Sequence, residues 1–263
     1  MTRKREKSKV WRRVLGIALV IGLLSVWVIG INRTANLRVQ EIQVNIDKVE
    51  GEKNLIAVSD IERLIKEDLP NDITFQSITD IDISMIEHML IADTRILSAE
   101  VYIDAKKDMV IDIIQRRPIL RVMNQHGDQF YVDQSGSYVR TVDKKATRVP
   151  VVTGYVESLE ADGHVAFNPR LQHAFQVVLE SRKDPVLKAL IEQVHVEKNQ
   201  RIIIIPKIGD DHIVLDHTDG LAEKLSNLRQ WYKELAKTNS WDKYNEFNIS
   251  YNDQVVVKNT ENP

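Results

Sequence analysis

The sequence predicts an α+β protein in which an N-terminal transmembrane helix precedes two folded parts. Three observations support this: an uncharged apolar run near the N-terminus, a stretch of mixed strand and helix signals, and a β-rich remainder. The first folded part should be a small β-α-α-β-β module, and the second a mainly antiparallel β domain with a few helices. The expected boundaries are a cytoplasmic basic tail at 1–13, the transmembrane helix at 14–31, the module at 37–117, the β domain at 118–258 and a tail at 259–263.

The apolar run at 14–31 is the basis for the transmembrane prediction. Its only polar side chain is Ser25. As a helix it would rise about 1.5 Å per residue, which brings its length close to the thickness of the hydrocarbon layer. A cleaved signal peptide would need a small residue where Arg33 stands before Ala35. We therefore expect an uncleaved anchor.

Charge is distributed unevenly along the chain. The first 13 residues hold seven of the 36 Lys and Arg but one of the 38 Asp and Glu. This bias predicts an N-terminus in the cytoplasm and folded parts on the periplasmic or extracytoplasmic side of the inner membrane. The rest of the chain is acidic, which disfavours a nucleic-acid partner. The absence of Cys excludes a disulfide framework and thiolate metal sites.

The β-α-α-β-β module is predicted element by element. Residues 37–46 alternate between apolar and polar positions, as a strand does. Ser59 begins a helix with capping-box spacing, and a second helix should cover about 82–92. Residues 101–114 then form a hairpin around a charged turn. The side chains expected in the core of this module are Ile61, Leu64, Ile65, Ile86, Leu90 and Val101.

The β domain is predicted from turn signals and two helices. Strand signals flank the turns at 133–136 and 199–200. Asn168 followed by Pro169 is a favourable helix start, and the clearest helix of the chain should begin after Asp219. A last β stretch runs from 246 to 258. Most of the aromatic side chains near the C-terminus are expected to pack in the core: Trp231, Tyr232, Trp241, Tyr244, Phe247 and Tyr251.

The sequence contains few candidates for catalysis. Nucleotide-binding glycine loops and the serine-hydrolase elbow are absent. His212 and His217 stand near several Asp residues, but Asp is common in turns and helix caps, so we expect no metal. The spacing of carboxylates along the sequence does not test for a catalytic pair of the glycosidase kind, because the two members of such a pair are brought together only by folding. We predict no enzyme activity, no cofactor and no small-molecule substrate.

The end of the chain is the predicted partner-binding site. Residues 247–257 allow two interpretations. They form either one continuous strand, whose alternate side chains make an apolar face, or two short strands joined by a turn at Asn252–Asp253. Both readings leave the final strand outermost, where its unpaired backbone groups could receive a strand from a partner. The alternative is a strand that merely closes the fold. Val256→Pro should separate the two, because it is expected to abolish partner capture but leave the protein folded if the strand is the binding site. The predicted partner-binding residues are Tyr251, Gln254, Val255, Val256, Val257 and Lys258.

Several segments in this order resemble the bacterial cell-division family FtsQ, called DivIB in some lineages. The segment AEVYIDAKKDMVIDIIQRRPILRV at 99–122 is similar to the end of the family's POTRA module. DQFYVDQSGSYVRT and RVPVVTG, ending at Gly154, are similar to the hairpin and the Pro-containing segment that follow it. GLAEKLSNLRQWYKEL and FNISYNDQVVVK resemble its closing helix and strands. Arg148-Val149-Pro150 departs from the commoner Leu-Pro.

The resemblance implies a function. It suggests a non-enzymatic division subunit at the septum that binds FtsB-like (DivIC-like) and FtsL-like coiled-coil partners and helps to control septal peptidoglycan synthases. It also implies that the 37–117 module has the POTRA fold. The alternatives are an envelope chaperone built on a POTRA module and a cell-wall hydrolase, which septal localisation and a peptidoglycan assay would distinguish.

Overall fold

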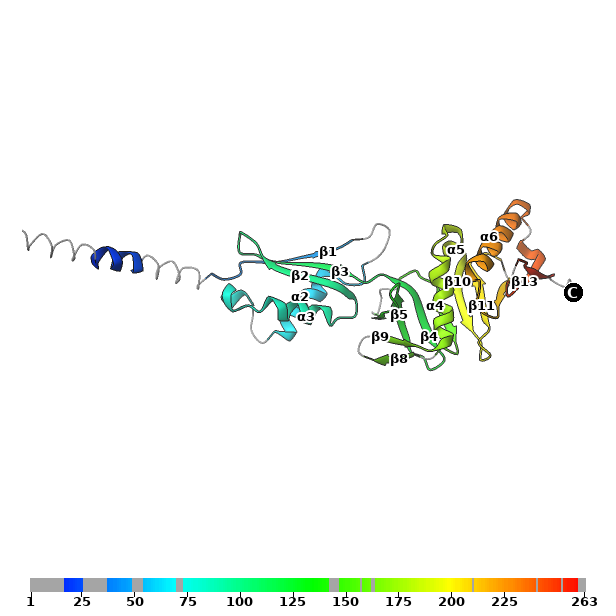
Figure 1. Cartoon of the computed structure of the whole chain (residues 1–263), viewed down its shortest axis with the longest axis horizontal. Coiled ribbons are helices and arrows are strands. Elements are labelled where there is room, and N and C mark those ends of the chain that lie inside the picture. Colours follow the sequence, from blue (N-terminus) through cyan, green and yellow to red (C-terminus); the bar gives the residue numbers. More distant parts are fainter. Residues whose placement is uncertain are drawn as a thin grey trace, which may run out of the picture. The chain divides into compact units, whose positions relative to one another are not determined.

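The computed structural model describes most of the chain (Figure 1). The described residues are 17–25, 37–48, 54–69, 73–141, 147–156, 158–161, 164–209, 211–239, 241–251 and 253–259. The chain divides into two compact units. Unit 1 comprises 1–47, 56–93 and 98–114, and unit 2 comprises 48–55, 94–97 and 115–263.

The predicted transmembrane helix requires a correction. Within the ranges just given, no helix is both long enough and apolar enough to cross a membrane. The part of this region that the structure describes, residues 17–25, is helical. The flanking parts of the predicted span, 14–16 and 26–31, lie outside the described residues.

Unit 1 is built on a three-stranded sheet with the order β1-β3-β2, in which β1 runs parallel to β3. Figure 1 shows both of its α-helices on the same side of this sheet. Two short 3-10 turns lie between the helices. The elements in chain order are β1 (Ile42–Ile46), α2 (Val58–Asp68), η1 (Ile73–Phe75), η2 (Ile78–Asp80), α3 (Ile83–Ile91), β2 (Ile96–Ile103) and β3 (Met109–Gln115).

The two helices of unit 1 begin at local caps. The backbone N–H of Ala57 donates to the Asp60 carboxylate at 2.9 Å, so α2 begins before the predicted cap at Ser59. Asp82 accepts from the N–H of Met85 at 3.0 Å and starts α3. Of the predicted core side chains, those that are buried are Ile61, Ile65, Ile86, Leu90 and Val101, whereas Leu64 is half-buried.

Unit 2 is built on a nine-stranded sheet with the order β14-β13-β12-β11-β10-β7-β4-β5-β6. Five of its strand pairs are antiparallel, but β4–β7, β7–β10 and β12–β13 are parallel. The sheet is therefore mixed, with more parallel pairing than the sequence predicted. Its strands are β4 (Pro118–Asn124), β5 (Gln129–Asp133), β6 (Tyr138–Arg140), β7 (Val151–Gly154), β10 (Ile191–Val196), β11 (Ile202–Pro206), β12 (His212–Leu215), β13 (Tyr244–Asn248) and β14 (Val256–Asn259).

The remaining elements of unit 2 are a small hairpin and the helices. The hairpin pairs β8 (Ser158–Ala161) with β9 (His164–Phe167). The helices are α4 (Pro169–Ser181), α5 (Pro185–Leu190), α6 (Leu221–Thr238) and the 3-10 turn η3 (Trp241–Lys243). Asn168 caps α4 by accepting from the N–H of Leu171 at 2.7 Å, as predicted. The short helix α5 was not predicted.

A continuous row of apolar side chains crosses the face of the sheet that packs against the helices. Successive register partners link its members from β5 to β14. We call this set the core row: Phe130, Val122, Val152, Val194, Ile204, Ile213, Phe247 and Val257. All but the last are buried. Because alternate residues of a strand face opposite sides, the core row defines a helix-covered face and a second, helix-free face.

Candidate partner-binding site at the C-terminal sheet edge

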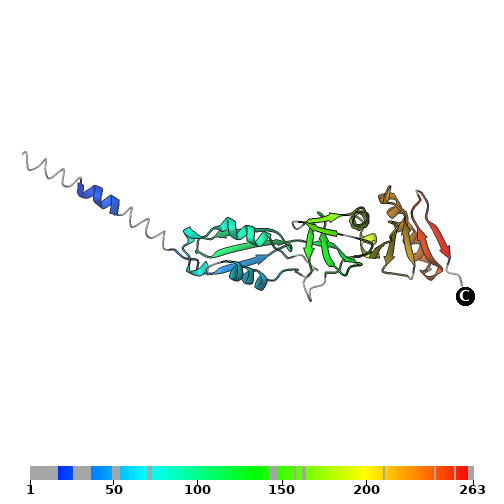
Figure 2. The same ribbon diagram turned by 90° about the horizontal axis from the view of Figure 1, so that it is seen from below.

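The last strand, β14, lies at one end of the nine-stranded sheet. It pairs with β13 alone within that sheet, and β6 occupies the other end. Figure 2 shows the red C-terminal strand at the outer margin of unit 2. The predicted outermost position of the final strand therefore agrees with the observed strand order.

The structure favours one of the two readings of residues 247–257. Strand β13 ends at Asn248 and β14 begins at Val256, so the stretch forms two antiparallel strands and not one continuous strand. Asp253 has a positive φ of 59° in the connection. Tyr251 lies in this connection and is 51% exposed, so it does not share an apolar face with Phe247. Of the predicted site residues, Val256, Val257 and Lys258 lie within β14, while Gln254 and Val255 precede it.

Neighbouring hydrogen bonds show which backbone groups of β14 face outward. The N–H of Ile249 donates to the carbonyl of Val214 on β12 at 2.9 Å. Backbone groups alternate in direction along a strand, so if Ile249 points its N–H toward β12, the preceding residue Asn248 points its N–H and C=O toward β14. The register partner of Asn248 on β14 is Val256. Val256 thus turns its N–H and C=O toward β13, and Val257 turns its own toward the free edge.

The side chains of β14 alternate between the two faces of the sheet. Val257 lies on the helix-covered face and ends the core row, where it is half-buried. Val255 also packs partly against the same core. Val256 is 46% exposed and projects from the helix-free face, as does Lys258. The edge therefore offers two half-buried valines on one face and the exposed side chains of Val256 and Lys258 on the other.

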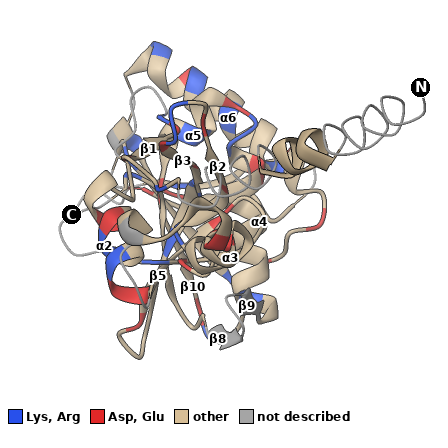
Figure 3. Ribbon diagram, turned by 90° about the vertical axis from the view of Figure 1, so that its left-hand side faces the viewer, with Lys and Arg blue, Asp and Glu red and all other residues tan. Residues whose placement is uncertain are grey.

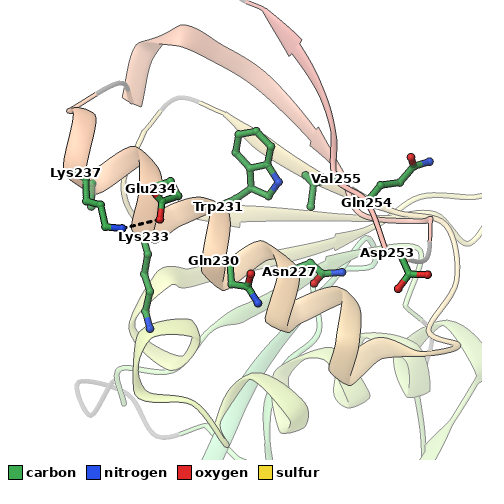
Figure 4. Close-up of a pocket in the computed structure, with 10 residues that line it drawn as sticks. Asn227, Gln230, Trp231, Lys233, Glu234, Lys237, Asp253, Gln254 and Val255 are labelled. Atoms are coloured by element: carbon green, nitrogen blue, oxygen red, sulfur yellow. Dashed lines mark hydrogen bonds and ion pairs between the residues drawn. The ribbon is translucent and has the colours of Figure 1, made fainter.

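A cleft of about 790 Å³ lies between α6 and the segment that leads into β14. Figure 4 shows Trp231 extending from α6 toward this segment, with Val255 beside it. The ion pair between Glu234 and Lys237 lies at the far end of the helix, with Nζ and Oε1 2.7 Å apart. The sequence did not predict this cleft. The exposed polar residues of α6 beside Trp231 are the signal that could have indicated it.

An aromatic cluster holds α6 against the last strands. Trp231 makes an edge contact with Tyr244, with ring centroids 6.2 Å apart, and both pack against Phe247. Tyr232 also contacts Phe247 and donates its hydroxyl to the Asp211 carboxylate. Burial, followed by this carboxylate, raises the pKa of Tyr232 above its ordinary value. The prediction that most of these aromatic residues pack in the core is therefore confirmed.

Charged side chains of both signs are interspersed along the described ribbon (Figure 3). Glu246, Lys258 and His212 form a row on the helix-free face next to the edge. The Glu246 carboxylate lies 2.9 Å from the Lys258 ammonium and 3.5 Å from Nε2 of His212. This row joins β12, β13 and β14 through their side chains, since His212 and Lys258 are the register partners of Glu246.

The histidines that stood near Asp residues in the sequence have separate surroundings. His212 contacts Glu246, while His217 lies 3.6 Å from Asp219 and accepts from the Lys224 ammonium at 3.0 Å. Burial lowers the pKa of Lys224. No three potential metal-ligating side chains come together in the part of the chain that the structure describes.

Comparison with known proteins places the chain in a family. The model of the family described as FtsQ/DivIB, C-terminal related, matches residues 117–258, more than half of the 263 residues. The chain therefore belongs to this family, which agrees with the resemblance found in the sequence. No curated protein matches the chain. Membership of this family supports a role in cell division.

Proposed function

We propose that this protein is a non-enzymatic scaffold of the cell-division machinery that captures a partner by adding a strand of that partner to β14. The partner is an FtsB-like (DivIC-like) coiled-coil protein, joined by an FtsL-like protein. Together they act at the division septum and help to control septal peptidoglycan synthesis. The family match supports the cell-division part of this proposal.

The exposed edge strand β14 of the nine-stranded sheet supports binding by strand addition. Unpaired N–H and C=O groups on an exposed strand favour pairing with another chain. Val257 directs such groups outward, as the register of β13 and β14 indicates. The core row also ends at this residue, so a side chain of an added strand could continue it. Backbone bonds would supply affinity and the alternate side chains specificity.

The register identifies a better test than Val256→Pro. Proline at Val257 removes an outward N–H and spares the bonds to β13, a position at which edge strands tolerate proline. We expect the full-length Val257→Pro protein to keep its circular dichroism spectrum and melting temperature but to lose co-purification with the FtsB-like protein. A tagged copy should still be produced in dividing cells but should fail to support septation.

Val256→Pro is the matched control. It removes an N–H that faces β13, so it should loosen β14 and lower the stability of unit 2 by about 1–3 kcal/mol. Partner capture by Val257→Pro at the wild-type level would rule out strand addition at this edge. Unfolding of Val257→Pro would instead show that β14 serves to close the fold.

A further inference from the structure

The edge strand β14 carries one charged side chain, Lys258, among its four residues. Lysines on edge strands commonly oppose the addition of another strand, because their charge would have to leave water. We propose that Glu246 holds the ammonium of Lys258 above β13, away from the free edge of the sheet. The outer edge of β14 thereby stays accessible to an added strand. This inference rests on the proposed function.

The positions of His212, Glu246 and Lys258 on the helix-free face support this role for Glu246. Glu246 and Lys258 are register partners and project from the same, helix-free face. The Lys258 ammonium lies 2.9 Å from Oε2 of Glu246, on the side of β14 away from the free edge. The Glu246 side chain is 19% exposed, whereas that of Lys258 is 67% exposed. The carboxylate is thus the better-fixed member of the pair.

A second side chain, His212, borders Glu246 on the inner side of the sheet. Nε2 of His212 on β12 lies 3.5 Å from the same carboxylate oxygen. His212 is the register partner of Glu246 in the parallel pair β12–β13. The carboxylate therefore lies between an inner imidazole and an outer ammonium, and only the aliphatic stem of Lys258 needs to border the added strand.

A simpler role for the ion pair is to stabilise the pairing of β13 with β14. The two roles predict opposite effects at Lys258. If the pair only stabilises the strands, loss of either charge weakens capture of the partner. If Glu246 restrains an obstructing charge, loss of Glu246 weakens capture but loss of Lys258 strengthens it. Glu246 is then a positioning residue, which acts through Lys258.

The test is a double-mutant cycle in the full-length chain, with binding of the purified FtsB-like protein measured by titration. Cross-strand charge pairs contribute on the order of 1 kcal/mol, equivalent to about fivefold in affinity. We expect Glu246→Gln to bind about fivefold more weakly and Lys258→Gln to bind more tightly than the wild type. The double variant should match Lys258→Gln, and the defect of Glu246→Gln should shrink in about 1 M salt, where charges are screened.

The cycle also separates this inference from the proposed function. Weaker binding by Lys258→Gln, or a double variant as weak as Glu246→Gln, would overturn the restraining role of Glu246. Val257→Pro is measured in the same assay. If Val257→Pro does not bind while Glu246→Gln binds like the wild type, only the inference about Glu246 fails. If Val257→Pro binds normally, the edge is not the site, and both proposals fail.

Discussion

Two carboxylates meet where the last connection of unit 2 passes the start of α6. A hydrogen bond with Asp253, followed by the charge of that residue, raises the pKa of Glu223. Both side chains are exposed, and Asp253 has a positive φ. Because the raised pKa belongs to an acid, ionisation of Glu223 opposes folding at neutral pH. That penalty is relieved as the pH falls through the raised value.

We therefore predict that Asp253→Asn raises the melting temperature at pH 7. Asparagine removes the carboxylate that faces Glu223 and tolerates positive φ well. The advantage over the wild type should shrink as acid protonates Glu223 in the wild-type protein. Melting curves recorded between about pH 7 and pH 4 would measure this. An advantage that does not change with pH would assign the effect to backbone conformation alone.

Individual residues also show where sequence reasoning succeeded. The cap at Asn168 was predicted because a cap depends on residues only a few positions apart. Tyr251 was expected in the core but is exposed. Strand β13 ends at Asn248, so the alternation of Phe247, Ile249 and Tyr251 in the sequence does not continue as a strand. The Lys258–Glu246 pair was not predicted, since it follows from the register of two strands.

At the scale of elements, the buried face of α2 carries a testable consequence. Ile61 is fully buried, whereas Leu64 is only half-buried. Ile61→Asp should destabilise unit 1 by about 3–5 kcal/mol, because it buries a charge without a partner. Leu64→Asp should cost clearly less, although the sequence predicted that Leu64 lies in the core together with Ile61. Denaturant unfolding of both variants would measure the difference, and equal losses would contradict the assigned face.

Helices were predicted well where length and periodicity agreed, as in α6, whose leucines face the core. The six-residue helix α5 was not predicted, because a proline such as Pro185 commonly marks the end of a preceding helix. Proline also suits the first turn of a helix, and Asp184 caps α5 by accepting from the N–H groups of Val186 and Leu187. A single residue type thus serves two opposite local roles, which only the surrounding structure separates.

At the scale of the whole molecule, the mixed sheet depends on partners far apart in sequence. Strand β7 pairs in parallel with β4, from which β5 and β6 separate it along the chain. It also pairs in parallel with β10, which follows only after the β8–β9 hairpin, α4 and α5. Apolar alternation predicts that a strand exists but not its neighbours, so these parallel pairings could not be predicted. The sequence predicted the outermost position of the final strand, but the order of the strands inside the sheet became known only with the structure.

Gly154 lies where β7 and β10 approach each other closely in the middle of this sheet. Its φ is +93°, and a Cβ atom there would lie 2.2 Å from the Val196 carbonyl oxygen. Gly154→Ala should therefore destabilise unit 2 by more than about 2 kcal/mol. Near-ultraviolet circular dichroism and tryptophan emission, to which Trp231 and Trp241 contribute, would follow the loss. An alanine variant that melts with the wild type would contradict the close approach of β7 and β10.

The outward direction of the Val257 backbone has a consequence for how such a surface changes over evolutionary time. Amide and carbonyl groups are the same in every residue except proline, so a ladder built from them tolerates most substitutions on either chain. Selection would act mainly against prolines with an outward N–H and against new charges beside the edge. Two lineages would then keep the affinity that comes from backbone bonds, while changes in the side chains of this strand alter which partner is preferred.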